Sequence, residues 1–88
     1  MNLESRIVVL LKNYAEQLDQ NLRYSKKYGD NSEELLAIFE PNKSKNGGAM
    51  NIEMIAHLAF SCAKLGAIDM WIDTYSDTST VELTLQIS

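Results

Sequence analysis

The C-terminal part of the sequence, TVELTLQI at positions 80–87, alternates strictly between polar and apolar side chains. Because successive side chains of a strand point to opposite faces of a sheet, this alternation predicts a strand with one buried face and one polar face. The apolar members are Val81, Leu83, Leu85 and Ile87. A two-stranded hairpin is only marginally stable in water, so other segments of the chain must cover this apolar face.

The preceding stretch, IDMWIDTYSD at positions 68–77, is predicted to be the second strand of an antiparallel hairpin. Its alternation separates an apolar face from a face that mixes aromatic and acidic side chains. The apolar face consists of Ile68, Met70 and Ile72. The other face consists of Asp69, Trp71, Asp73 and Tyr75.

The register of this hairpin follows from matching the two apolar faces, which pairs Ile72 with either Leu83 or Val81. The first register places Asp73 directly opposite Glu82, where two like charges repel each other. Such carboxylates are either screened by salt and water or offered to a cation or a basic side chain.

Three segments before the hairpin are predicted to be helices. Residues 3–26 carry an apolar stripe at three- and four-residue steps, with Asn2 as a candidate N-cap and Gly29 as a candidate stop signal. The stripe consists of Leu3, Ile7, Leu10, Leu11, Tyr14, Leu18 and Leu22. Residues 31–40 are predicted to form a short middle helix, because an acidic first turn precedes an apolar run and Pro41 ends the segment.

The third predicted helix, residues 51–65, is apolar almost all round. Its polar positions fall within one arc that is roughly 80° wide. These positions are Glu53, His57, Ser61 and Lys64. We therefore expect a central, mostly buried helix with one narrow solvent-facing stripe, which ends at Gly66.

Together these segments predict an α+β fold. Two or three helices (long N-terminal, short middle, buried central) are expected to pack on the C-terminal antiparallel β-hairpin. Residues 1–88 should form a single domain with one core and a flexible loop at 41–48. Neither hairpin strand has a proline or a lysine to protect its edge, so we expect a homodimer in which paired edges extend the hairpin to a larger, four-stranded sheet.

The sequence does not favour catalysis or metal binding. Glu53, His57 and Ser61 share one helix face, but a serine on a solvent-facing helix row has no oxyanion hole beside it. Cys62 lies about 140° round the helix from the single histidine, so the two cannot hold one ion. No acidic segment has the spacing of a calcium loop. We expect no catalytic residue, no metal site, no cofactor and no enzyme activity.

The distribution of charge limits the class of partner. The net charge is −4, with seven basic and seven acidic residues before position 49 and Lys64 alone against five acidic residues after it. An acidic half repels phosphate backbones, so we expect no nucleic-acid partner, and a protein partner with a basic surface is favoured. Ordinary solubility is the alternative explanation of the charge.

Cysteine content and hydropathy indicate the compartment. Cys62 is the single cysteine, and a small secreted domain would usually need several, so a reducing cytoplasm is expected. The apolar run at residues 7–11 is too short for a signal peptide or a membrane span, so no membrane association is expected.

The leading functional hypothesis is a small cytosolic protein-binding module of the immunity-protein, antitoxin or phage-inhibitor type. Aromatic side chains surrounded by polar groups are typical of protein interaction surfaces. The residues predicted to bind the partner are Asp69, Trp71, Asp73, Tyr75 and Glu82. The alternative for Trp71 is that the first helix or the 41–48 loop covers it, or that it packs flat across the neighbouring strands.

The alternative hypothesis is a small-molecule or nucleotide-binding protein. The loop at 41–48 holds two lysines and two glycines just before a predicted helix start, where free backbone N–H groups can bind an anion. The candidate anion-binding residues are Lys43, Lys45, Gly47 and Gly48. The loop lacks the spacing of a P-loop, and a solvated loop without a ligand explains the same composition.

Overall fold

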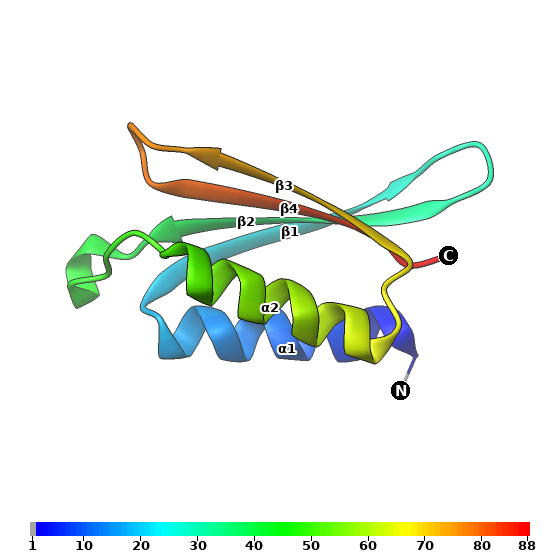
Figure 1. Cartoon of the computed structure of the whole chain (residues 1–88), viewed down its shortest axis with the longest axis horizontal. Coiled ribbons are helices and arrows are strands. Elements are labelled where there is room, and N and C mark those ends of the chain that lie inside the picture. Colours follow the sequence, from blue (N-terminus) through cyan, green and yellow to red (C-terminus); the bar gives the residue numbers. More distant parts are fainter. Residues whose placement is uncertain (1) are drawn as a thin grey trace.

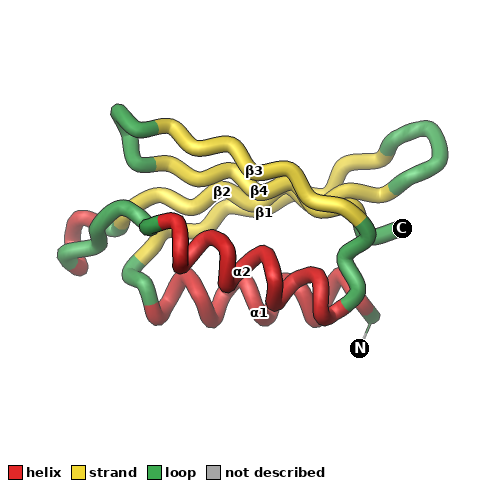
Figure 2. Tube along the Cα trace, viewed as in Figure 1, coloured by secondary structure: helices red, strands yellow, loops and turns green. Residues whose placement is uncertain are grey.

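The chain folds into a layer of two helices on one face of a four-stranded antiparallel sheet (Figures 1 and 2), in a computed structural model that describes residues 2–88. The helices are α1 (Leu3–Gln17) and α2 (Ile52–Leu65), and a short 3-10 helix, η1 (Lys43–Lys45), precedes α2. The strands are β1 (Gln20–Tyr28), β2 (Glu33–Pro41), β3 (Asp69–Tyr75) and β4 (Thr80–Gln86). The strand order is β1-β2-β4-β3, so β1 and β3 are the edges.

The C-terminal hairpin is confirmed. Of the two registers that match the apolar faces, the chain adopts the one in which Ile72 pairs with Leu83 and Asp73 pairs with Glu82. The hairpin is not isolated, because β4 also pairs with β2. The sheet thus reaches four strands within one chain. Four strands do not require the expected homodimer, which stays a prediction.

The N-terminal helix begins as predicted but ends early. The Asn2 side chain caps it by accepting a hydrogen bond from the Ser5 backbone N–H at 2.8 Å. It ends at Gln17 rather than at residue 26, because Asp19 adopts a left-handed conformation (φ 51°) that turns the chain into β1. Gly29 does not stop a helix. It lies in the turn between β1 and β2.

The predicted short middle helix is wrong, because residues 33–41 form β2. Leu35, Ala37 and Phe39 are buried on the face toward the helices, and Leu36 and Ile38 are half-buried on the other face. In a central strand that is covered on one side and partly covered on the other, the apolar residues follow one another in the sequence without alternation. Such a run cannot be distinguished from a short buried helix by periodicity alone.

The bounds of α2 are confirmed, but its expected burial is wrong. Asn51 caps the helix by accepting a hydrogen bond from the Met54 N–H at 2.9 Å, and Gly66 (φ 122°) follows its last residue. The prediction of a mostly buried helix fails because α2 packs on α1 and on the sheet but has no neighbour on its third side. There Ile52 is 81% exposed and Phe60 is 62% exposed.

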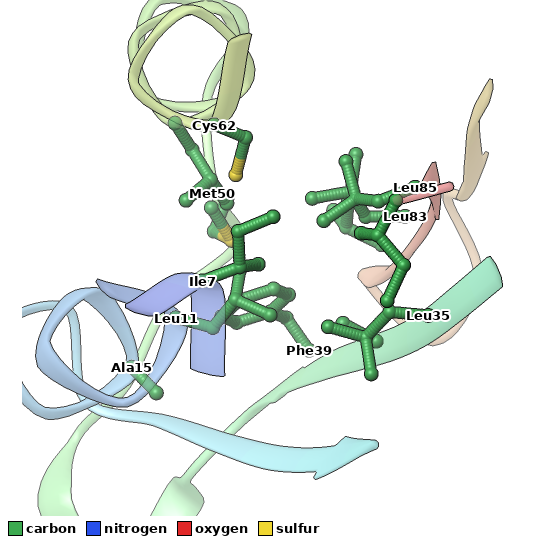
Figure 3. Packing of buried hydrophobic residues seen from close by; sticks show 13 residues of the cluster. Ile7, Leu11, Ala15, Leu35, Phe39, Met50, Cys62, Leu83 and Leu85 are labelled. Atoms are coloured by element: carbon green, nitrogen blue, oxygen red, sulfur yellow. The ribbon is translucent and has the colours of Figure 1, made fainter. Parts of the chain in front are cut away.

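The core lies between the helices and the two central strands (Figure 3). Its helical part consists of Ile7, Leu11, Ala15, Leu58 and Cys62, with Met50 just before α2. Its sheet part consists of Leu35, Ala37, Phe39, Val81, Leu83, Leu85 and Ile87. Neither edge strand contributes a fully buried apolar side chain to this cluster, so the apolar side chains that remain exposed gather along the two edges.

Candidate functional site: the outer face of the hairpin

The residues predicted to bind a partner lie together on the sheet face that the helices leave uncovered. Asp69, Trp71, Asp73 and Tyr75 alternate along β3 with the inward-facing residues, and Glu82 lies beside Asp73 on β4. Trp71 is 48% exposed and Tyr75 is 46% exposed. Neither α1 nor the loop at 41–48 covers the indole, so that part of the alternative is wrong.

The carboxylates of this face have no cation beside them within residues 2–88. The salt bridges of the described chain join Arg23 to Glu40, and Lys26 to Glu4 and Glu33, all away from the hairpin. Glu82 raises the pKa of the Tyr75 hydroxyl, first through a side-chain hydrogen bond and then through its charge. The face therefore offers uncompensated negative charge around two half-exposed aromatic rings.

A region of mixed charge lies on the opposite edge of the same face, where the sequence predicts a helix. Arg23 and Lys27 of β1 project outward beside Glu40 and Glu34 of β2. The signal that predicts this hairpin is the run Gly-Asp-Asn-Ser at residues 29–32, which is typical of a turn between two strands.

An apolar groove beside β3 was also not expected. It encloses about 440 Å³ between the free side of α2 and the inward-facing side chains of β3. Its lining consists of Met50, Ile52, Ile55, Ala56, Ile72 and Thr74. Apolar residues all round residues 52–65 were interpreted as burial, whereas part of that surface faces this open groove.

The residues predicted to bind an anion do not all converge. Lys43, Gly47 and Gly48 line a cleft of about 470 Å³, but Lys45 is not part of its lining. Two carboxylates, Glu40 and Asp77, line the same cleft.

Gly47 has a structural role in this loop. A Cβ atom there would lie 2.1 Å from the backbone oxygen of Asp19 and 2.7 Å from the backbone nitrogen of Asn42. The Gly47 N–H donates to the Asn42 carbonyl at 2.9 Å. Close backbone packing therefore requires a glycine at this position, whether or not a ligand binds.

The polar stripe of α2 makes contacts between the two helices. The Tyr14 hydroxyl contacts Nδ1 of His57 and lies 3.1 Å from Oγ of Ser61, which donates to the His57 carbonyl at 2.9 Å. Cys62 is fully buried, and burial raises the pKa of its thiol to about 11. Within residues 2–88, no group of three or more His, Cys, Asp or Glu side chains is placed to hold a metal ion.

The chain matches no known protein family, and neither a curated protein nor a solved structure is significantly similar to it. In the described part of the chain, neither helix has the length and apolar character required to cross a bilayer. The candidate site therefore rests on the geometry of the hairpin alone.

Proposed function

We propose that this chain is a small acidic protein-binding module, of the immunity-protein, antitoxin or phage-inhibitor kind, that docks a partner through the outer face of the β3–β4 hairpin. The docking residues are Asp69, Trp71, Asp73, Tyr75 and Glu82. The observation that carries this proposal is the half-exposed indole of Trp71, which lies between carboxylates that form no salt bridge with a cation of residues 2–88.

The expected partner has a basic surface with a hollow for the indole. Trp and Tyr supply much of the binding energy at protein interfaces, and truncating a central one typically costs about 2 kcal/mol or more. The carboxylates mainly accelerate association and exclude acidic partners. Binding should therefore weaken as ionic strength rises, while the contribution of Trp71 should persist at high salt.

A retention experiment with a matched control tests this proposal. The docking variant is Trp71→Ala with Asp73→Lys. The control variant is Tyr28→Ala with Asp30→Lys, which removes one exposed aromatic ring and reverses one exposed carboxylate at the far turn of the sheet. The immobilised natural chain and the control should retain the same basic protein from the cell extract, and the docking variant should lose it. Equal retention by all three chains would exclude this face.

A cross-linking experiment identifies the contact directly. A photoreactive side chain at Thr84, which lies opposite Trp71 on the outer face, should attach to the retained protein. The same group at Ser44, which is exposed in η1, should not attach. Attachment from Ser44 and not from Thr84 would move the docking site to the 41–48 loop.

The cleft beside η1 supports a second proposal, the binding of a small molecule or nucleotide by Lys43, Gly47 and Gly48. The favourable observation is its volume of about 470 Å³, which suits a small ligand. The pairing of one lysine with two carboxylates in the lining makes it a weaker anion site than the sequence predicts. A thermal-shift screen tests it, because a ligand at 100 times its Kd should add about 2.7 kcal/mol of stability.

A further inference from the structure

The two edges of the sheet carry complementary charges at the same spacing. On the outer face, β1 presents Arg23, which forms a salt bridge with Glu40, and Lys27, which lies opposite Glu34, whereas β3 presents Asp69 and Asp73. Both pairs are four residues apart, so both lie on a single face of their strand. We propose that the β3 edge of one chain pairs antiparallel with the β1 edge of a second copy.

The free backbone groups of the β3 edge can be assigned from the ladder. The Ile87 N–H donates to the Glu33 carbonyl at 2.9 Å, so the odd-numbered residues of β4 bond to β2 and the even-numbered ones bond to β3. The even-numbered residues of β4 lie opposite odd-numbered residues of β3. Met70, Ile72 and Thr74 therefore direct their backbone N–H and C=O groups outward, although the Met70 N–H donates to Oδ1 of Asp69 at 2.8 Å and must exchange that bond on pairing.

The free groups of the β1 edge follow in the same way. The Asn42 N–H donates to the Asp19 carbonyl at 2.9 Å, which continues the ladder in which odd-numbered residues of β1 bond to β2. The even-numbered residues Leu22, Tyr24 and Lys26 therefore direct their backbone groups outward. The two edges can exchange a regular antiparallel set of hydrogen bonds.

One register satisfies both the hydrogen bonds and the charges. Pairing Ile72 with Tyr24 of the second copy places Asp73 opposite Arg23 and Asp69 opposite Lys27. Trp71 then lies opposite the small Ser25, so its indole stays on the outer face. Opposite charges in directly paired positions stabilise a sheet. A shift of two residues in either direction removes both charge pairs.

The exposed apolar side chains also match across this junction. One group lies beside β3 and consists of Ile52, Ile68 and Ile72. The other lies at the β1 edge and consists of Val9, Tyr24 and Tyr28. The same register pairs Ile72 with Tyr24 and Ile68 with Tyr28. The apolar groove of one copy thus meets the tyrosine edge of the next.

The helix layer fits the same repeat. Four strands spaced about 4.8 Å apart give a repeat of roughly 19 Å. Two packed helices, with axes 8–10 Å apart, occupy about the same width. The α1 helix of the second copy therefore comes to lie beside the free side of α2, where Ile52 is exposed. Pairing of β3 with β3 would instead bring two acidic strands together without a cation on either strand.

This pairing is heterologous, so each copy keeps one free edge and assembly can continue. It uses the strand that also carries the proposed docking face, but it does not depend on that function. A chain that stays monomeric at all concentrations overturns the pairing and leaves the docking proposal intact.

Sedimentation velocity over a range of micromolar concentrations, at low and high salt, tests the pairing. The natural chain should form species larger than 9.9 kDa, and salt should weaken them. Arg23→Glu with Lys27→Glu, or Asp69→Lys with Asp73→Lys, should each weaken association by roughly tenfold or more, because attraction becomes repulsion at two paired positions. An equimolar mixture of the two variants should regain association, because the reversed edges again complement each other.

The control variant reverses the charge of two lysines that lie away from both edges. Lys43→Glu with Lys45→Glu makes the same change in net charge as the β1 variant and should leave association unchanged. The single changes Lys27→Glu and Asp69→Lys break no intrachain salt bridge, so they keep the test valid if loss of Arg23 disturbs the fold. Self-association of the β1 variant alone would overturn the proposal in favour of β3–β3 pairing.

Discussion

Reversal of the Asp73 charge should stabilise the folded chain while it weakens the proposed docking. Asp73 lies directly opposite Glu82 in the β3–β4 ladder, and no cation of residues 2–88 forms a salt bridge with either of them. Like charges in this position destabilise a sheet, and opposite charges stabilise it, by about 0.2–1 kcal/mol each. Asp73→Lys replaces the repulsive pair with an attractive one, so the free energy of unfolding should rise by roughly 1 kcal/mol.

Urea denaturation measures this change, and a thermal melt provides a second measure. A gain of 1 kcal/mol in a domain of this size should raise the Tm by about 4–8 °C. Asp73→Asn should give about half of the gain, because it removes the repulsion without adding an attraction. Asp77→Lys, in the turn, is the control and should change the stability little, because Asp77 has no partner in the ladder. A fall in stability for Asp73→Lys would show that the two carboxylates do not repel each other in the folded chain.

Further predictions concern the loop, the buried thiol and alkaline pH. In urea denaturation, Gly47→Ala should destabilise the fold by roughly 2 kcal/mol or more, because its Cβ would overlap the Asp19 carbonyl. Gly48→Ala should change the stability by less than about 1 kcal/mol, because the space around Gly48 is open. Burial raises the pKa of the Cys62 thiol to about 11. This thiol should therefore resist alkylation at pH 8 until urea unfolds the chain. Rapid modification without urea would contradict its burial. Hydrogen bonds to two glutamates raise the pKa of Lys26, so its stabilising effect is present below its unfolded pKa of about 10.4 and is lost at higher pH. Urea denaturation at increasing alkaline pH should therefore show a steeper loss of stability for the natural chain than for Lys26→Met.

The elements that the sequence predicts correctly are those whose local pattern permits one interpretation. Strict alternation over residues 80–87 is typical of a strand, and it limits the hairpin to the two registers that match the apolar faces, one of which the chain adopts. The exposure of Trp71 follows only from the folded structure, because it depends on where the other elements lie. The start of α1 and both ends of α2 follow from Asn2, Asn51 and Gly66, because capping acts within one turn of a helix.

The first hairpin could not be predicted in this way, because its residue spacing fits two structures. Leu18 and Leu22 are four residues apart, and this spacing puts two side chains on the same face of a helix and on the same face of a strand. The apolar run at residues 35–39 is equally consistent with a buried helix and with the central strand that it forms. Only pairing with β1 and with β4, of which β4 is distant in sequence, selects the strand.

This error also concealed the position of two basic side chains on the outer face. When the first two strands are taken as helices, Arg23 and Lys27 have no relation to the acidic strand, and the sequence shows only a balanced first half and an acidic second half. In the folded sheet the same residues form one edge, and Asp69 and Asp73 form the other. The separation of charge, rather than its sum, therefore determines which surfaces attract each other. Two helices cover the central strands and leave apolar side chains exposed beside both of these charged edges, so burial and electrostatics favour contact at the same places.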